Sequence, residues 1–454
     1  MKFAPKDLAA VLMSKSPGKS GQILKRFEYS SSLSPQLALG PAADLPAPSP
    51  DLSSVQTDQL AAAMKTGDQE KIEQAVVREI ARLKSSAGSP EIAEQFTPIP
   101  KKGRCLTVTE AIQGFEPVLR RLPEHKWWHK GLQPAGSEHL PREAASFILG
   151  CLEAVKARLN GAGVALQEAK EAGNYLIWTQ EQASSGVIPI PAIAGCTRDG
   201  AFLSADRFLR KATASGALES IRGNGWIIDD LDDGGLQFDT GEAGIALFNL
   251  YQITGEKKFL RSAESCASWA EQRPVVPNWN YNSFSVYLLS KAYEVTGQKH
   301  FLDSAVRKAR TGVIPGQLTA GPRAGSWFDG HNARRVYHYI MMRSLAQLLA
   351  VMPADHPDRA TIRSALCRGL AVSNQELIDC GAPTKNSAVT ALILVVTLLK
   401  SDPELIKSSK SDQALDRLSR LVSEQYRHGR LPLSPASWGQ FLNWVVTRQQ
   451  VNGL

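Results

Sequence analysis

The chain has 454 residues, 43% of them hydrophobic, which is enough for a large core in one repetitive domain or in two or three smaller ones. Its 52 basic and 44 acidic side chains give a net charge of +8 without a polybasic run. Nucleic-acid binding, which usually requires a denser basic stripe with interleaved aromatic residues, is therefore disfavoured, whereas an acidic small molecule or polysaccharide fits this excess. No run of about 18 apolar residues is present that would cross a membrane.

The chain start and the cysteines indicate the compartment. Residues 1–21 carry charges on both sides of a short apolar piece and lack a clear small-residue cleavage site, which argues against a signal peptide and favours a cytoplasmic protein. The six cysteines are scattered without a CxxC spacing, which indicates neither a disulfide framework nor a zinc site. We expect no metal and no cofactor.

The composition divides the chain into three parts. Residues 1–55 are rich in Ser, Pro and Ala and predict a flexible arm. Residues 56–139 predict a helical extension followed by connecting loops, with apolar side chains at helical spacing at Ile72, Val76, Ile80 and Leu83. From residue 140 to 454 the pattern is helical almost throughout, and we expect one catalytic domain there.

An internal repeat is the most informative feature of this domain. The segment "LYQITGEKKFLRSA" (250–263) aligns with "AYEVTGQKHFLDSA" (292–305) at a shift of 42 residues. Each copy reads as the end of one helix, a glycine just past it, and the start of the next helix. The repeat unit is therefore a helical hairpin, and such hairpins stack because one alone cannot bury its apolar face.

Similar hairpins can be drawn elsewhere between residues 140 and 450, about six in all, which is enough to close an α/α toroid. The "TG…FL..A" seam, together with loops rich in Trp, Asp, Asn and His before every second helix, resembles the six-hairpin glycosidase-like (α/α)6 superfamily. That group includes glycoside hydrolases, unsaturated glucuronyl hydrolases and N-acylglucosamine 2-epimerases, with alginate- and heparin-type polysaccharide lyases on related toroids. The resemblance implies an all-α (α/α)6 toroid that acts on carbohydrate.

Three loops are expected to open on one face of the toroid and to form the substrate site. They are "NGWIIDDLDDGGLQFDTGE" (224–242), "NWNYNSF" (278–284) and "WFDGHNARR" (327–335). Aromatic rings cover the apolar faces of sugars while polar groups bind the hydroxyls. The predicted substrate-binding residues are Trp226, Glu242, Trp279, Asn280, Asn282, Trp327, Asp329 and Arg334.

The third loop runs into a helix that begins with cations. Asn332 is an expected N-cap, which would put Arg334 and Arg335 in the first turn, where cations oppose the helix dipole. Two guanidinium groups above a helix N-terminus make a good carboxylate or phosphate site. The alternative is that one arginine pairs with Asp329 and that His331 is only a turn residue.

Two mechanisms remain open for this site. In elimination, an Asn, Arg or His neutralises a uronate carboxylate while Tyr or His groups move protons. The resemblance to toroid lyases implies these roles, with acid and base unassigned, for His331, Asn332, Arg335, Tyr337, His338 and Tyr281. In hydrolysis, two carboxylates flank the bond. The candidates are Asp229, Asp230, Asp232, Asp233, Asp239, Glu242 and Asp329, of which we select Asp230, Asp233 and Asp239 as catalytic.

Other readings stay possible for the same residues. The acidic turn 229–233 is either solvated or a general-acid site, and it lacks the spacing of a calcium loop. Sugar epimerisation would use similar proton-transferring groups. A non-catalytic helical scaffold that binds a glycan or a protein is the alternative from another class, and it would form an open superhelix rather than a closed ring. We expect an enzyme acting on an acidic, uronate-containing oligo- or polysaccharide, by elimination or hydrolysis.

Overall fold

The computed structural model describes most of the chain from residue 57 onward. The described residues are 13, 57–86, 96–100, 103–121, 140–183, 185–192, 203–223, 225–231, 234–276, 278–319, 324–327, 335–383, 387–400, 402–430 and 435–451. The predicted arm, 1–55, lies outside them except for Met13.

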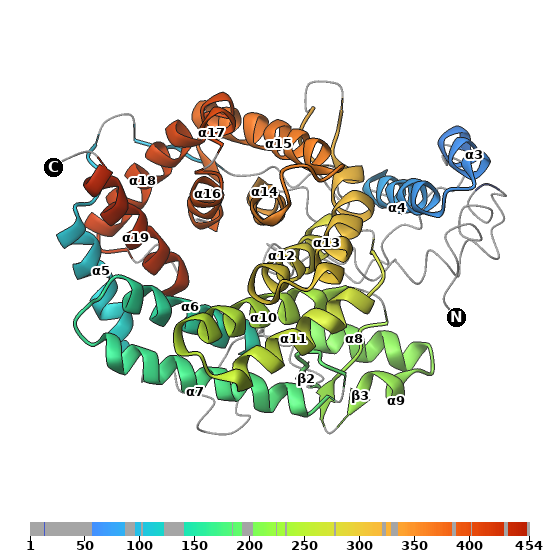
Figure 1. Ribbon diagram of the computed structural model, residues 1–454, viewed down its shortest axis with the longest axis horizontal. Helices are drawn as coiled ribbons and strands as arrows, with labels where there is room; N and C mark the ends of the chain where they lie inside the picture. Colours follow the sequence, from blue (N-terminus) through green and yellow to red (C-terminus); the bar gives the residue numbers. More distant parts are fainter. Residues whose placement is uncertain are drawn as a thin grey trace, which may run out of the picture.

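Two concentric layers of helices form the body of the protein (Figure 1). The inner layer consists of α6 (Leu140–Lys156), α10 (Gly235–Thr254), α12 (Trp279–Thr296), α14 (Arg335–Val351), α16 (Ser387–Leu398) and α19 (Pro435–Val451). The outer layer consists of α5 (Val108–Arg121), α7 (Ala162–Glu181), α11 (Lys257–Gln272), α13 (Lys299–Gly312), α15 (Arg359–Cys380) and α18 (Ser411–Arg427).

The inner layer is a closed ring. Each inner helix packs against the next in the order α6, α10, α12, α14, α16 and α19, and α19 packs against α6 again. Each inner helix is backed by one outer helix, as for α6 with α7 and α12 with α13. The predicted (α/α)6 toroid is therefore confirmed, and the ring is not the open superhelix expected of a scaffold.

The sixth hairpin is assembled from two distant parts of the sequence. Helix α5 precedes the ring in the chain, yet it packs against α19 and is the outer partner of that last inner helix. Gly114 on α5 allows this close approach, because a Cβ there would lie 2.2 Å from the indole of Trp438. The toroid thus draws one helix from the segment 56–139 that the sequence analysis assigned to an extension, and its first helix is α5 rather than one at residue 140.

The internal repeat corresponds to two successive hairpins, α10–α11 and α12–α13. Gly255 and Gly297 both adopt φ 70°, a left-handed conformation that favours glycine, and each follows the last residue of an inner helix. Their N–H groups donate to the carbonyl oxygens of Tyr251 and Tyr293 at 2.8 Å in both copies. The prediction of a helix end at each glycine is confirmed.

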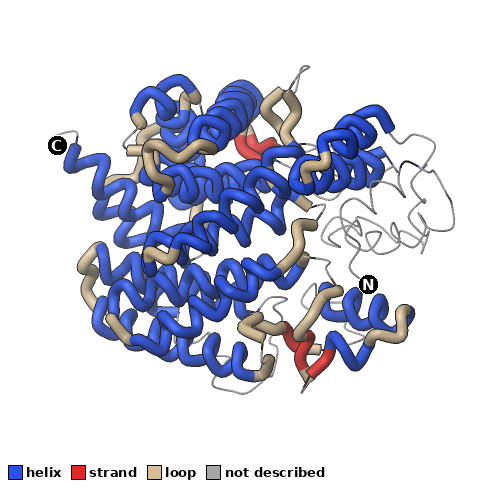
Figure 2. The backbone as a smooth tube through the Cα atoms, turned by 45° about the vertical axis from the view of Figure 1, so that its right-hand side comes forward, coloured by secondary structure: helices blue, strands red, loops and turns tan. Residues whose placement is uncertain are grey.

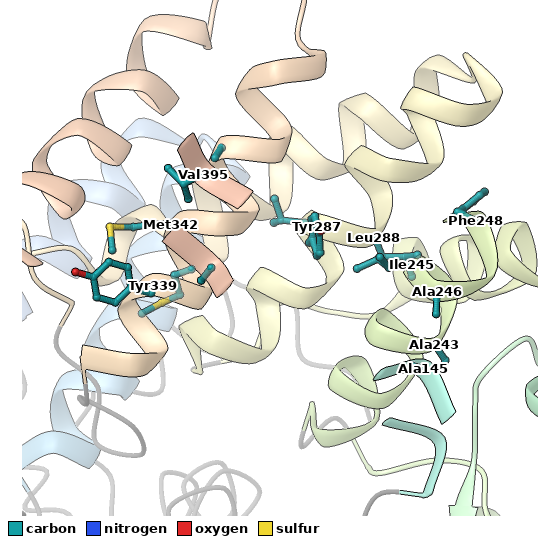
Figure 3. Packing of buried hydrophobic residues seen from close by; sticks show 14 of the residues in the cluster. Ala145, Ala243, Ile245, Ala246, Phe248, Tyr287, Leu288, Tyr339, Met342 and Val395 are labelled. Carbon is teal, nitrogen blue, oxygen red and sulfur yellow. The ribbon is translucent and has the colours of Figure 1, made fainter. Parts of the chain in front are cut away.

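Alternating large and small side chains fit the inner helices together. Gly241 and Gly244 on α10 face Phe284 and Leu288 on α12, where a Cβ would lie 3.0 Å and 2.7 Å from their nearest atoms. Figure 3 shows the resulting apolar layer, in which Tyr287 and Leu288 of α12 lie between Ile245 and Ala246 of α10 and Tyr339 and Met342 of α14. This packing fixes the relative positions of the inner helices, and hence of any polar side chain that they direct into the ring.

The remaining elements lie between or beside the ring helices, and Figure 2 shows their short strands in red. The connection from α7 to α10 contains the helices α8 (Leu203–Ala214) and α9 (Leu218–Ile221). It also contains a small antiparallel sheet with the strand order β2 (Ile190–Pro191), β4 (Trp226–Ile227), β3 (Arg222–Gly223). β1 (Phe96–Thr97) pairs antiparallel with β5 (Ala382–Pro383), a 3-10 helix η7 (Ile314–Gly316) follows α13, and α17 (Pro403–Ser408) precedes α18. Across the described ranges, no helix is long and apolar enough to cross a membrane.

Helix α3 (Thr57–Thr66) packs against α4 (Gln69–Ser86), and α4 docks on the outside of the ring at α13 and η7. Arg310 of the outer helix α13 forms ion pairs of 3.0 Å with Glu70 on α4 and with Asp358 before α15. Nearby, Lys308 of α13 is fully buried, and its Nζ donates to the Arg273 carbonyl at 2.6 Å. Burial and the neighbouring Arg307 lower the pKa of Lys308 to about 7, against the opposing effect of Glu73.

Candidate functional site

The connections between helices differ in length on the two faces of the ring. The return from an inner helix to its outer partner is short, as at Gly255 and Glu256 between α10 and α11. The passage from an outer helix to the next inner helix is longer in places, and the one from α7 to α10 contains α8, α9 and a sheet. Since the helices alternate up and down, the inner helices begin on the face with these longer loops, where functional groups are expected.

Several of the predicted site residues lie outside the described residues. Asp233, Asp329, His331, Asn332 and Arg334 are among them, and so is the side chain of Arg335, whose backbone begins α14. Their proposed roles stay predictions.

The three predicted tryptophans are core residues. Trp226, Trp279 and Trp327 are among the largest fully buried side chains. The indole of Trp279 packs against Gly316, and Trp327 Nε1 donates to the carbonyl oxygen of Val313 at 2.8 Å. A ring covered on all sides by protein cannot stack on a sugar, so we leave these three residues out of the candidate site.

The two predicted asparagines shape the start of α12. Asn282 bridges neighbouring segments, because its Nδ2 donates to the carbonyl oxygens of Val276 and Gly312 and its Oδ1 accepts from the Val276 N–H. Asn280 is 2% exposed, and its Oδ1 accepts no hydrogen bond from a described residue. The N-cap of α12 is Asn278, which the sequence analysis did not select.

Asp230 holds the loop that leads into α10. Its Oδ2 accepts hydrogen bonds from the N–H groups of Gly234 and Leu236 at 3.0 and 2.9 Å, which satisfies donors at the start of the helix. Tyr281, near the beginning of α12, packs against the same loop, where a Cβ on Gly234 would lie 3.0 Å from its ring. Both side chains are largely buried, so in this conformation they support the loop.

The start of α14 places two further candidates. His338 is fully buried, with its imidazole 5.6 Å from the ring of Trp327, whereas Tyr337 is half-buried. Both lie in the first turn after Arg335, but the burial of His338 removes it from direct contact with a ligand.

Asp239 lies inside the ring in a bidentate ion pair. Arg142 of α6 donates from Nε and Nη2 to its two carboxylate oxygens at 2.7 and 2.8 Å. The Arg142 guanidinium carbon also lies 3.3 Å from the centre of the Phe238 ring, which stacks at 3.9 Å on Phe284 of α12. This stack links three inner helices by charge and aromatic contact.

One turn further along α10, Glu242 forms a second pair with Arg343 of α14. Arg343 Nη2 donates to Glu242 Oε1 at 2.8 Å, and no described residue donates to Glu242 Oε2. The guanidinium carbon of Arg343 lies 4.6 Å from the centre of the Tyr287 ring and 5.7 Å from that of Phe284. Together with Asp239, this pair brings two carboxylates and two arginines into the ring from α6, α10 and α14.

Two groups of this cluster have shifted pKa values. Burial raises the pKa of Tyr287 to about 12, the Arg343 cation opposes that rise, and the carboxylates of Glu242, Glu294 and Glu153 add to it. Burial alone would lower the pKa of Arg343, but the adjacent Glu242 carboxylate raises it above its ordinary value. At neutral pH the cluster therefore holds a charged guanidinium beside a protonated phenol.

A second polar group lies near the C-terminal ends of the inner helices. Glu153 pairs with Lys156 at 2.7 Å and with Asn443, while Glu294 pairs with Lys291 at 2.7 Å. In both glutamates the two carboxylate oxygens accept hydrogen bonds, the second of Glu294 from Gln347. This group is internally satisfied, which distinguishes it from the Glu242–Arg343 pair.

The sequence analysis did not select five residues of this site, and some of them carry a signal in the sequence. They are Arg142, Phe238, Phe284, Tyr287 and Arg343. Arg343 is the one cation in the apolar stretch "MMRSLAQLLAVM", which marks a charge that a packed helix must accommodate. Phe238 and Glu242 are four residues apart and hence share a helix face, as do Phe284 and Tyr287 at three. Arg142 left no local signal, because its partner is 97 residues away.

No protein-family model matches the chain, and no curated protein matches it significantly. Among solved structures, a glycosyl hydrolase of family 88 from Bacteroides vulgatus has a TM-score of 0.48 at 11% identity over 76% of this chain and 99% of that one. A cellobiose 2-epimerase from Spirochaeta thermophila has a TM-score of 0.44 at 12% identity over 78% and 100%. A polysaccharide lyase has a TM-score of 0.47 at 12% identity over 76% and 99%. Likenesses at this level assign neither substrate nor reaction.

Proposed function

We propose that this protein is a carbohydrate-active enzyme in which Glu242 transfers the proton. The observation that carries the proposal is the Glu242–Arg343 pair, which faces into a closed ring with one carboxylate oxygen unengaged by described residues. The side chains of Glu242 and Arg343 are 19% and 15% exposed, so a ligand can reach them. A carboxylate with a free oxygen, positioned by a neighbouring cation, is suited to general acid–base catalysis.

Hydrolysis of a glycosidic bond fits the described residues best. Asp239 supplies a second carboxylate three residues before Glu242 on the same face of α10, and hydrolysis uses two carboxylates. Arg142 holds both oxygens of Asp239 by charge-assisted hydrogen bonds, and Glu242 is the carboxylate that donates to the leaving oxygen. His338, which elimination would use, is fully buried.

Elimination is the second candidate, and Tyr287 favours it. Its ring lies under the Arg343 guanidinium, so a cation that neutralises a uronate carboxylate and a phenol that protonates a leaving oxygen would act side by side. In both reactions Arg343 would bind the carboxylate of an acidic sugar, and we propose a uronate-containing oligosaccharide as the substrate.

The test is a screen of the purified full chain against polyuronates, glycosaminoglycans and neutral glucans. New reducing ends without the ultraviolet absorbance of an unsaturated product would support hydrolysis, and both signals together would support elimination. A change in the NMR spectrum of a sugar without either signal would support epimerisation. Activity that survives Glu242→Gln unchanged would refute the role proposed for that residue.

A further inference from the structure

The Glu242–Arg343 pair suggests how an acidic substrate would be selected. We propose that Arg343 is a charge-selective switch: the carboxylate of a bound sugar takes the Arg343 guanidinium away from Glu242, and Glu242 then takes up a proton from solvent. The protonated Glu242 gives that proton to the leaving oxygen as the C–O bond breaks, and attacking water returns one proton to the solvent. The inference rests on the proposed function and names the class of substrate that turns it on.

The geometry gives Arg343 the capacity for a second acceptor. A guanidinium has five N–H donors, yet Arg343 donates one hydrogen bond to a described residue, and its Nε is buried without a partner among those residues. The rings of Phe284 and Tyr287 lie 5.7 and 4.6 Å from the guanidinium carbon, so the planar group can turn toward a ligand against aromatic faces.

The Arg142–Asp239 pair is less able to exchange its carboxylate for that of a ligand. There both carboxylate oxygens are held by two donors, and Asp239 is 2% exposed. A ligand carboxylate would have to break two short hydrogen bonds to displace it, whereas one bond joins Arg343 to Glu242. The exchange is therefore assigned to Arg343.

The surrounding charges set the direction of the change. The other charged groups near the pair are Glu294 and Glu153, which raise the pKa of Tyr287, their partners Lys291 and Lys156, and the Arg142–Asp239 pair one turn before Glu242. Their cations are each paired with a carboxylate of the same group. None of these cations is therefore left to offset the carboxylate of a sugar bound beside Glu242. Glu242 then loses Arg343 as its partner and gains a negative neighbour, and both changes favour its protonated form.

Calorimetry can detect this step without turnover. The probes are D-glucuronate and the matched neutral sugar D-glucose, each titrated at mildly acidic pH in two buffers that differ in ionisation enthalpy. Glucuronate binding is expected to take up close to one proton and glucose binding none. Glu242→Gln, a near-isosteric neutral change, is expected to retain glucuronate binding but to abolish the uptake.

Arg343 variants provide the control on selectivity. Arg343→Gln is expected to weaken glucuronate binding about tenfold relative to glucose, and Arg343→Lys to restore part of the difference. Glucuronate binding without proton uptake, in an enzyme that turns over acidic saccharides, would overturn the inference and leave the proposed function standing. Failure of the folded protein to bind either sugar or to process any saccharide would refute both.

Discussion

Arg142 on α6 and Asp239 on α10 hold two neighbouring inner helices together by a bidentate ion pair with bonds of 2.7 and 2.8 Å. Arg142→Met leaves the Asp239 charge in an almost fully buried position, so we expect a loss of about 3 kcal/mol in the free energy of unfolding, measured by urea denaturation. The double variant Arg142→Met with Asp239→Leu should regain most of it. The Arg104–Glu110 pair, in which Arg104 is 62% exposed, is the control, and Arg104→Met should cost far less than Arg142→Met. Equal costs at both sites would contradict the stabilising role of the ring pair.

Glu242→Gln should lower kcat about 100- to 10,000-fold on any substrate that the screen finds, because the amide cannot transfer the proton. Far-ultraviolet circular dichroism should be unchanged. Glu264→Gln on the outer helix α11 is the matched control, since this exposed carboxylate accepts a hydrogen bond from Gln298 outside the ring. A similar loss in both variants would show that the effect is not local to the site.

Lys308 should make stability depend on pH. Its pKa is lowered to about 7 in the folded protein from the ordinary 10.5, so between these values the unfolded chain binds more protons. The free energy of unfolding should therefore rise with pH from about 7 to about 10, and this contribution should be lost as the pH falls to 7. Denaturation of wild type and Lys308→Met across this range should give a shallower slope for the variant. Lys258→Met, at a half-buried lysine of the outer helix α11, is the matched control.

Gly316 should not accept a side chain. A Cβ at this position would lie 2.3 Å from Cε2 and Nε1 of the buried Trp279 indole, and the ring has no space to move away. We expect Gly316→Ala to destabilise the protein by about 2–3 kcal/mol. Gly163→Ala, in an exposed turn of α7 with no atom within 4 Å of the new Cβ, should instead stabilise it by about 0.5–1 kcal/mol. Thermal unfolding of the two variants gives the comparison.

A chain that begins at residue 140 should not fold to a cooperative unit. It lacks α5, whose Phe115 is fully buried and whose Gly114 contacts Trp438 on α19, so part of the sixth hairpin would be exposed. A chain that begins at residue 96 keeps α5 and should unfold cooperatively. A sharp calorimetric transition for the shorter chain would contradict the assignment of α5 to the ring.

The hairpins were predictable because their signals are local. The glycine that ends α10 and the one that ends α12 lie beside the residues that they affect, and the 42-residue shift repeats them. The partner of α5 was not predictable in this way, because α19 lies at the other end of the sequence and no periodicity joins the two.

The site was predicted less well, and the physical reason is burial. Tryptophan in a loop reads equally as a sugar platform or as a core residue, and the sequence does not indicate what covers the ring. Trp226 and Trp279 turned out to be covered. Asp239 and Glu242 were selected on residue type and position, but the arginines that pair with them come from α6 and α14, which only the closed ring brings near.

The closure of the ring through α5 and α19 has a consequence for synthesis on the ribosome. Helix α5 is translated before the five hairpins that separate it from α19, the helix that it covers, so its apolar side stays uncovered while those hairpins are made. The final helix must then insert between α16 and α6 as well as under α5. Nascent chains stalled before residue 435 would therefore hold an unclosed arc with exposed apolar edges.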